Sequence, residues 1–333
     1  MNKTFKKLIC ASLTGIFAAL SLASCGGNSV TETTENNGDI ADAEYRIGIC
    51  QYIEHAALDS STKGFKDALT EKLGDKVAFD HKDATGERSN AATICSMFVA
   101  DKYDLIFANS TNALAAAAHA TAEIPVVGCS VTDFASTLGY TEWNGFTSSN
   151  VTGASDLLPL ELQAEVIHDL FPYAENIGIL YCSSETNSKY QSDTIKTYLE
   201  GYGYTCTEYS FVDTTDLIAV TEKAASESDV LYTPTDNTVA ANTEAIKNVL
   251  EPAKKPLVAG NNDVARECGV ATVGIEYYDL GYKAGIMAYE ILCNGADPGT
   301  MDIEYADSYL KRYVPGRCEE LGITVPGIYK PLD

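Results

Sequence analysis

The feature that most constrains the fold of this chain is a regular alternation of strand-like and helix-like segments that begins at Tyr45. Short apolar, β-branched runs are typical of buried strands. They recur at 46–53, 104–109, 124–131, 176–182, 229–234, 256–260 and 270–275. Helical patterns separate most of them, for example 58–73, 88–101, 157–171 and 277–293. This alternation predicts βαβ units and parallel sheets that helices cover on both faces.

The strand and helix series occurs twice, which indicates two lobes. Between the two series, segment 136–153 is rich in Gly, Ser, Thr and Asn, and we interpret it as a crossing between lobes. We expect helix 277–294 to return to the first lobe. The predicted fold is therefore α/β, with two doubly wound, Rossmann-like lobes joined by a multi-strand hinge. The first lobe takes 45–150 plus 273–300, and the second takes 151–272 plus 301–333.

The N-terminal segment has the pattern of a bacterial export signal. Three lysines precede an apolar run over residues 8–22, which is too short to span a bilayer. Ala23 and Ser24 stand directly before Cys25, as in a lipobox, so we predict removal of residues 1–24 and lipidation of Cys25. The alternative is an ordinary signal peptide with a chance cysteine. Residues 25–44 have the composition of a flexible tether, and we expect an extracytoplasmic protein anchored to the cell membrane.

Charge and cysteine content exclude several classes of protein. The formal net charge is -24, so the chain repels phosphate backbones and is not expected to bind nucleic acid. Two of the ten cysteines, Cys10 and Cys25, belong to the signal and the anchor. The other eight are scattered without CxxC spacing, which argues against a disulfide framework or a zinc module. We predict that they are mostly buried free thiols.

The candidate binding residues lie directly after the predicted strands. Ligands of parallel sheets bind at the carboxyl ends of the strands. Small polar or acidic residues at these positions act either as helix N-caps or as contacts for a ligand's carboxylate and ammonium groups, and one residue can serve both purposes. We predict a ligand-binding cleft between the lobes, lined by Tyr52, His55, Asp59, Thr111, Asn112, Thr132, Asp133, Ser155, Asp156, Glu185, Asn187, Thr235, Asp236, Asn237, Asn261 and Glu276.

Motifs for catalysis are missing from the sequence. There is no GxxxxGK[ST] phosphate loop, no GxGxxG after the first strand, no HExxH and no GxSxG. His55 and Asp59 stand four residues apart, but two ligands without a third make a poor metal site. We therefore expect neither enzymatic activity nor a metal or other cofactor.

Six segments together resemble the substrate-binding proteins of ABC transporters, in the family that includes tryptophan- and tyrosine-binding lipoproteins. The segments are IGICQYIEHAALD (47–59), IPVVGCSVTD (124–133), NVTGASD (150–156), IGILYCSSETNS (177–188), DVLYTPTDNTV (229–239) and VGIEYYDLG (273–281). Members usually carry Thr-Pro where this chain has Thr111-Asn112. The resemblance implies a type I periplasmic-binding fold, a cognate permease and ATPase, and an amino acid or related small solute as ligand, aromatic amino acids being favoured.

The resemblance also implies roles for the candidate residues. The ligand's amino group or hydroxyls would bind Asp133, Asp236 and Asn237. Its carboxylate or other polar atoms would bind Thr111, Ser155, Glu185 and Asn187, and its side chain would lie against Tyr52 and His55. We expect a monomer. A lipoprotein sensor or chemoreceptor partner of the same fold stays open as an alternative, because the sequence does not distinguish it from a transport protein.

Overall fold

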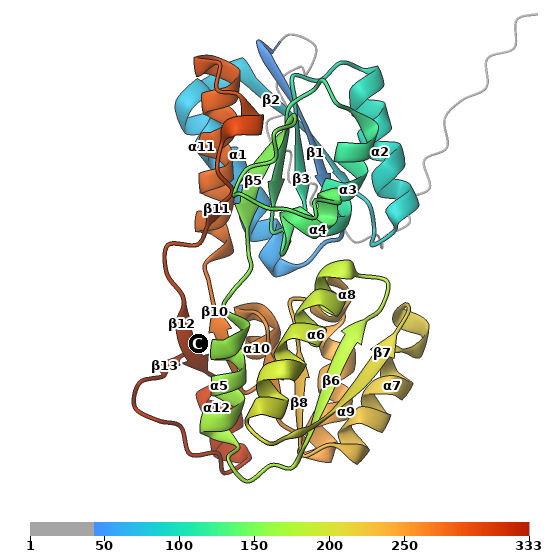
Figure 1. Ribbon diagram of the computed structural model, residues 1–333, viewed down its shortest axis with the longest axis vertical. Coiled ribbons are helices and arrows are strands. Elements are labelled where there is room, and N and C mark those ends of the chain that lie inside the picture. Colours follow the sequence, from blue (N-terminus) through green and yellow to red (C-terminus); the bar gives the residue numbers. More distant parts are fainter. Residues whose placement is uncertain (1–42, 333) are drawn as a thin grey trace, which may run out of the picture. The chain divides into compact units, whose positions relative to one another are not determined.

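Two separate β-sheets, each with helices on both faces, form residues 43–332, which are the residues that this computed structural model describes (Figure 1). Both lie within one unit of the chain. The predicted signal peptide, the lipidation site at Cys25 and nearly all of the predicted tether lie outside the described residues. Within residues 43–332, none of the helices combines the length and apolar character needed to cross a membrane.

Sheet 1 has six parallel strands in the order β11-β5-β4-β3-β1-β2. The central strands alternate their side chains between two apolar layers, because successive residues of a strand point to opposite faces. Ile47 and Ile49 pack on one face, and Cys50 packs on the other. The strands are β1 (Tyr45–Gln51), β2 (Val77–Asp83), β3 (Leu105–Asn109), β4 (Val126–Cys129), β5 (Val151–Ser155) and β11 (Glu304–Tyr305).

Sheet 2 has seven strands in the order β13-β12-β10-β9-β8-β6-β7, and all pairs are parallel except β10 with β12. The antiparallel pair adds the C-terminal segment to the edge of an otherwise parallel sheet. The strands are β6 (Asn176–Cys182), β7 (Thr205–Phe211), β8 (Val230–Thr233), β9 (Leu257–Ala259), β10 (Ala271–Gly274), β12 (Leu310–Tyr313) and β13 (Lys330–Pro331).

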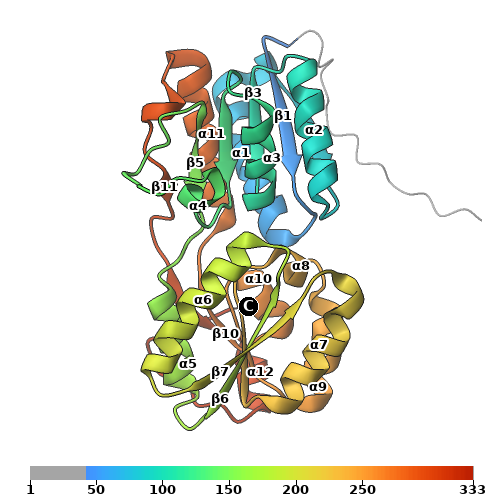
Figure 2. The same cartoon turned by 45° about the vertical axis from the view of Figure 1, so that its right-hand side comes forward.

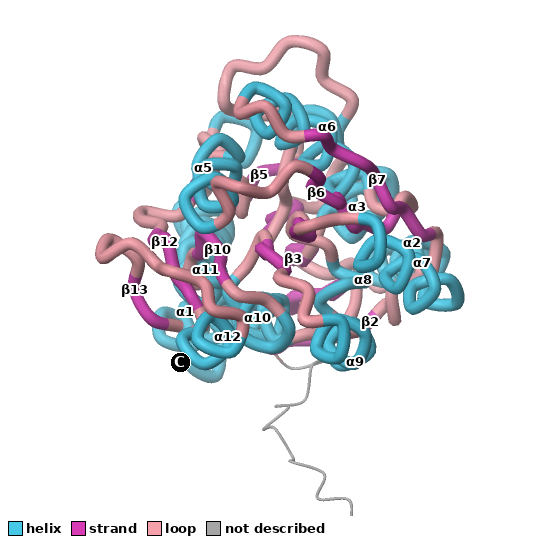
Figure 3. The backbone as a smooth tube through the Cα atoms, turned by 90° about the horizontal axis from the view of Figure 1, so that it is seen from below, coloured by secondary structure: helices cyan, strands magenta, loops and turns pink. Residues whose placement is uncertain are grey.

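Helices connect the strands and cover the sheets. They are α1 (Ala56–Leu73), α2 (Arg88–Ala100), α3 (Thr111–Ala120), α4 (Phe134–Leu138), α5 (Leu160–Leu170), α6 (Thr186–Gly201), α7 (Thr214–Glu227), α8 (Asn237–Ala240), α9 (Thr243–Ala253), α10 (Asn262–Cys268), α11 (Tyr277–Asn294) and α12 (Pro315–Glu320). In sheet 1, α1 and α11 lie on one face, and α2 and α3 lie on the other (Figures 1 and 2). In sheet 2, α5 and α6 lie opposite α7, α9 and α10 (Figure 3).

Helix α11 returns to the first lobe, as predicted, and packs closely against α1. Glycine makes this approach possible. A Cβ atom on Gly281 would lie 1.9 Å from the Ser61 carbonyl oxygen, and one on Gly64 would lie 2.1 Å from the Tyr278 carbonyl oxygen. Any larger residue at these positions would force the two helices apart. The first helix of this lobe, α1, therefore packs against a helix that lies more than 200 residues later in the chain, since α1 begins at Ala56 and α11 at Tyr277.

The chain crosses between the sheets three times, at β5–α5, at β10–α11 and between β11 and β12. The sequence-based boundaries differ from this arrangement by one strand in two places. β5 and β11 both belong to sheet 1, where they pair with each other, although the boundaries at 150 and 300 assign them to the second lobe. Segment 136–153 is thus not the crossing, which begins only after Ser155.

The eight cysteines among the described residues are free. Cys50, Cys129 and Cys182 are buried within β1, β4 and β6, which confirms the prediction for them. Cys95, Cys268 and Cys318 are buried as well, whereas Cys206 is half-buried and Cys293 is exposed. Most of these thiols therefore act as small apolar side chains in the core.

Candidate ligand-binding site

A small cavity lies where the carboxyl ends of strands from both sheets meet. Eight of its eleven lining residues are among the candidates from the sequence, and Leu58, Ser130 and Tyr277 complete it. Its volume is about 10 Å³, which is the room that one water-sized group needs. A group as small as an ammonium fits this space, while a whole amino acid requires the lobes to separate. The eight predicted residues are His55, Thr132, Asp156, Asn187, Thr235, Asp236, Asn237 and Asn261.

Asp156 is a carboxylate in the wall of this cavity and is only 6% exposed. It lies at the first crossing, directly after β5. Its oxygens accept hydrogen bonds from the Thr132 hydroxyl at 3.2 Å and from the Tyr277 hydroxyl at 2.9 Å. Burial raises the pKa of Asp156, and these two donors partly oppose the increase. Neither donor carries a charge, so a cationic ligand group would supply the missing counter-charge.

His55 presents a second acceptor to the cavity. Its Nε2 lies 3.2 Å from Oδ1 of Asn237, whose Nδ2 donates to Glu185. Because that donation fixes the orientation of the amide, Nε2 carries the proton and donates it to Oδ1, and Nδ1 is an acceptor. Burial lowers the pKa of His55, so the ring is neutral at neutral pH. Nδ1 is buried and has no hydrogen-bond partner among the described residues.

Asn187 supplies the third acceptor. Its Nδ2 donates to the Thr235 carbonyl at 2.8 Å, which leaves Oδ1 buried without a partner among residues 43–332. Unpaired buried polar atoms are costly, and they concentrate where a ligand completes the hydrogen bonds. The cavity thus combines the Asp156 carboxylate, which has no counter-charge, with two unpaired neutral acceptors, while the Asp236 carboxyl in the same lining accepts from backbone N–H groups. This set matches a ligand group with several N–H donors and a positive charge.

Asp236 and Glu185 form an acidic pair beside the cavity. Asp236 caps α8 by accepting from the Val239 N–H at 2.9 Å, and it also accepts from the Cys182 N–H at 2.7 Å. Burial, followed by the nearby Glu185 charge, raises the pKa of Asp236 to about 8. Glu185 is fully buried, and its oxygens accept from Asn237 and Thr238 at the start of α8. Both acids therefore position the α8 loop.

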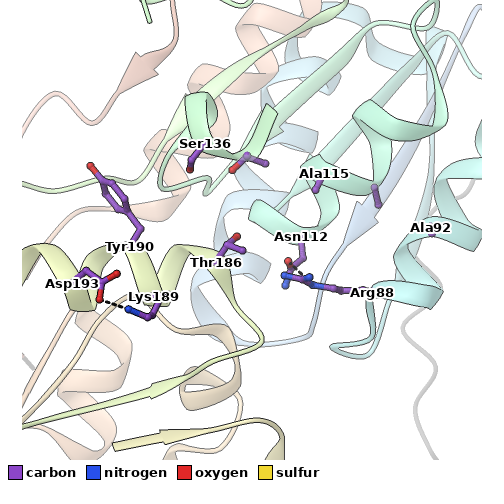
Figure 4. A pocket seen from close by; sticks show the side chains of 11 residues that line it. Arg88, Ala92, Asn112, Ala115, Ser136, Thr186, Lys189, Tyr190 and Asp193 are labelled. Atoms are coloured by element: carbon purple, nitrogen blue, oxygen red, sulfur yellow. Dashed lines mark hydrogen bonds and ion pairs between the residues drawn. The ribbon is translucent and has the colours of Figure 1, made fainter. Parts of the chain in front are cut away.

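A wider groove of about 540 Å³ lies next to the cavity, between α2, α3 and α4 of the first lobe and α6 of the second (Figure 4). Arg88 and Asn112 point toward each other at one end of it, and Lys189 forms an ion pair with Asp193 at the other. Thr186 lines the groove and the next residue, Asn187, lines the cavity. The N-terminus of α6 therefore borders both spaces.

Within residues 43–332, three side-chain hydrogen bonds link the lobes directly. Besides the pair between His55 and Asn237, Nη2 of Arg88 donates to the Ser184 carbonyl at 2.8 Å. Nε2 of Gln191 on α6 donates to the Thr132 hydroxyl at 3.2 Å, and the same amide holds Thr235. The wall of the cavity is thus continuous from one lobe to the other.

Eight predicted residues lie outside the lining of the cavity, and most of them make other contacts. Tyr52 donates to the Gly86 carbonyl, Asp59 is exposed and accepts from Gln51, and Ser155 donates to the Thr132 carbonyl. Asp133 caps α4, and Glu276 is exposed and pairs with Arg312. Thr111 and Asn112 begin α3, where Asn112 lines the groove, and Glu185 accepts hydrogen bonds from the start of α8.

Sequence patterns did not indicate Ser130 and Leu58 as lining residues of the cavity, or Arg88 as a lining residue of the groove. Ser130 lies inside the predicted strand 124–131, but β4 ends at Cys129. Leu58 lies one turn into α1, where an apolar residue is expected to face the core. Tyr277 begins α11 shortly after β10, where the sequence places a tyrosine at the cleft and hinge, and it does line the cavity. Within residues 43–332, His55 and Asp59 have no further side chains around them that would complete a metal site.

Comparison with known proteins agrees with this geometry. The family model described as ABC transporter substrate binding protein matches residues 46–327. A tyrosine-binding protein of Clostridioides difficile (strain R20291) is 32% identical over 306 residues, which cover 91% of this chain and 88% of that protein.

Two solved structures have comparable sequence identity. The structure of an ABC domain from Streptococcus pneumonia in complex with L-Trp has a TM-score of 0.81 at 31% identity, covering 84% of this chain and 95% of that one. The ligand-free, open structure of a substrate binding protein from Clostridium difficile has a TM-score of 0.64 at 32% identity, covering 86% and 99%. The architecture is that of type I periplasmic binding proteins, as predicted. The chain belongs to the family of ABC transporter substrate-binding proteins.

Proposed function

We propose that this chain captures an amino acid with an aromatic side chain outside the cytoplasm and delivers it to an ABC permease and its ATPase. The observation that carries the proposal is the set of three acceptors in the cavity: Asp156, Nδ1 of His55 and Oδ1 of Asn187. An ammonium group has three N–H donors and one positive charge, so it satisfies all three acceptors and neutralises the carboxylate. The relatives that bind tyrosine and tryptophan support the choice of an aromatic side chain.

The proposed mechanism is closure of two lobes around the ligand, with no covalent chemistry. A ligand that contacts both lobes stabilises the closed state over the open one, and the permease distinguishes the two states. Asp156 and His55 belong to the first lobe or its crossing, whereas Asn187 and Asn237 belong to the second. The chain also has a higher TM-score to the L-Trp complex than to the open, ligand-free structure at nearly equal identity, which supports a closed arrangement.

We further propose that the protein is held at the membrane by a lipid on Cys25. The basis is the lipobox pattern, Ala23-Ser24-Cys25. Membrane fractionation of cells that express the wild type and Cys25→Ser tests the lipid anchor. We expect the variant to lose the lipid and leave the membrane fraction, while a wild type without lipid would contradict the proposal.

The ligand is tested by a thermal-shift screen of the 20 amino acids, followed by calorimetry. Ligand that binds only the folded state raises the melting temperature by mass action. We expect the largest increase with tyrosine or tryptophan, and we expect Asp156→Asn to weaken binding at least tenfold because it removes the counter-charge. If no aromatic amino acid raises the melting temperature, the assigned ligand class is refuted. An unchanged ligand affinity of Asp156→Asn would refute the ammonium site.

A further inference from the structure

Ser110 and Asn112 present unpaired donors at the N-terminus of α3. Ser110 is 1% exposed and Asn112 is 4% exposed, and neither Oγ of Ser110 nor Nδ2 of Asn112 has a hydrogen-bond partner among residues 43–332. Ser110 gives α3 no side-chain cap, so the first N–H groups of this ten-residue helix receive no cap from it. A helix N-terminus with free N–H groups attracts anions.

Arg88 adds a positive charge to this group. Its Nε donates to Oδ1 of Asn112 at 3.1 Å, which assigns Nδ2 of the amide as the buried, unpaired donor. Its Nη2 donates to the Ser184 carbonyl of the other lobe, and Nη1 has no partner among the described residues. Lys189, the other cation that lines the groove, is already paired with Asp193. Arg88 is thus the lining cation with capacity for an additional anion.

These donors lie beside the three-acceptor cavity. The Ser110 N–H donates to the Cys129 carbonyl at 2.9 Å, so Ser110 is next to Ser130, which lines the cavity. Asn112 and Arg88 line the adjoining groove, and Figure 4 shows the two side chains meeting there. A group of hydrogen-bond acceptors and a group of donors therefore lie side by side. An amino acid carries its ammonium and carboxylate groups on one carbon and needs acceptors and donors in such neighbouring positions.

We propose that Arg88, Asn112 and Ser110 form the subsite for the ligand's carboxylate. This inference rests on the proposed function, because it assumes that the ammonium occupies the acceptors around Asp156. Arg88 supplies the charge and orients Asn112, and Asn112, Ser110 and the start of α3 supply neutral donors. Since Arg88 also reaches Ser184, carboxylate binding and lobe closure depend on the same guanidinium. The subsite selects free amino acids over amines and amides of equal size.

The experiment compares acids with their amides. Calorimetry measures binding of L-tyrosine, L-tryptophan, tyrosinamide and tryptophanamide to the wild-type chain, Arg88→Gln, Asn112→Ala and the control Lys189→Gln. We expect the wild type to bind the acids at least tenfold more tightly than the amides. Arg88→Gln should lose at least tenfold affinity for the acids and less than threefold for the amides. Asn112→Ala should show the same pattern with a smaller loss, and Lys189→Gln should match the wild type.

The outcomes separate this subsite from the proposed function. Equal losses for acids and amides in Arg88→Gln would show that Arg88 acts only as a link between the lobes, and would overturn the subsite. A wild type that binds acids and amides equally would overturn it too, while the aromatic ligand class would stand. If neither tyrosine nor tryptophan binds the wild type, the ligand class and the subsite both fail. Circular dichroism of each variant verifies that it is folded.

Discussion

The Tyr277 hydroxyl donates a 2.9 Å hydrogen bond to Oδ2 of Asp156, and this bond joins two of the three crossings between the lobes. Tyr277 begins α11 after β10, and Asp156 follows β5, so the two residues lie 121 positions apart in the chain. Both are buried in the cavity wall. The carboxylate that we assign to the ligand's ammonium is therefore held at the hinge itself.

Removing the Tyr277 hydroxyl should weaken ligand binding without unfolding the protein. Tyr277→Phe keeps the ring but removes a donor to an ionised carboxylate, an interaction that contributes about 1.5–3 kcal/mol. This corresponds to a loss of about ten- to a hundredfold in affinity. Calorimetry with tyrosine or tryptophan measures the loss, and an unchanged affinity would show that Asp156 does not depend on this donor. Tyr278→Phe is the control, because the Tyr278 hydroxyl binds Asp67 away from the cavity.

The link between Gln191 and Thr132 should stabilise the closed state. In Gln191→Ala the second lobe loses its hydrogen bonds to Thr132 and to Thr235. We expect faster ligand dissociation with a nearly unchanged association rate, because this contact between the lobes forms only on closure. Stopped-flow fluorescence separates the two rates. A slower association at constant dissociation would contradict this role for Gln191.

The raised pKa of Asp236 predicts that the free energy of unfolding decreases as the pH rises. Its pKa is about 8 in the folded chain against 3.8 for an ordinary aspartate, so the folded state binds more protons than the unfolded state between these values. The free energy of unfolding of the ligand-free protein should fall as the pH rises from about 4 to about 8. Burial also raises the pKa of Asp156, which acts in the same direction. Thermal melts across this range should therefore show a smaller decrease for Asp236→Asn than for the wild type, and equal slopes would refute the shift.

The close contact between α1 and α11 predicts that one added methyl group lowers the free energy of unfolding substantially. In Gly281→Ala the new Cβ atom would lie 1.9 Å from the Ser61 carbonyl oxygen, so the helices must separate. Overpacking of this kind costs about 1–3 kcal/mol of the free energy of unfolding. Gly201→Ala is the matched control, since nothing lies within 4 Å of its added Cβ. In urea denaturation, Gly281→Ala should unfold at a lower midpoint than the wild type, and Gly201→Ala should not. Equal midpoints for Gly281→Ala and the wild type would show that the two helices adapt to the added methyl group.

The buried strands of the fold could be predicted from the sequence because their apolar runs are continuous. Each of the seven predicted strands corresponds to an observed one, with ends that differ by at most two residues. The strands that were missed are edge strands or irregular ones. β2, at an edge of sheet 1, contains Asp80, His81, Lys82 and Asp83, which look like a loop, and β7, at an edge of sheet 2, alternates polar and apolar residues. β5 contains Gly153 at a φ of 151°, where an added Cβ atom would lie 2.0 Å from the Gly128 carbonyl oxygen.

The same reason explains which part of the site was missed. Parallel strands end at one edge of a sheet, so polar residues after predicted strands, such as Thr132 and Asp236, could be assigned to the cavity. Arg88 follows β2, and without that strand its loop has no assigned place at the sheet edge. Tertiary hydrogen bonds also cannot be predicted from the positions of polar residues after the strands. They direct Glu185 toward the start of α8.

The return of α11 to α1 has a consequence for the order of folding. The apolar face of α1 has its partner only after Tyr277 and the residues that follow it have been synthesised. Contacts so distant along the chain form slowly, and until then an unfinished lobe exposes apolar surface. The second lobe, by contrast, has β6 to β10 in one uninterrupted stretch. The lobe that is made first therefore stays incomplete until β6 to β10 of the other lobe have been made, and its sheet gains its last strand, β11, only in the final tenth of the chain.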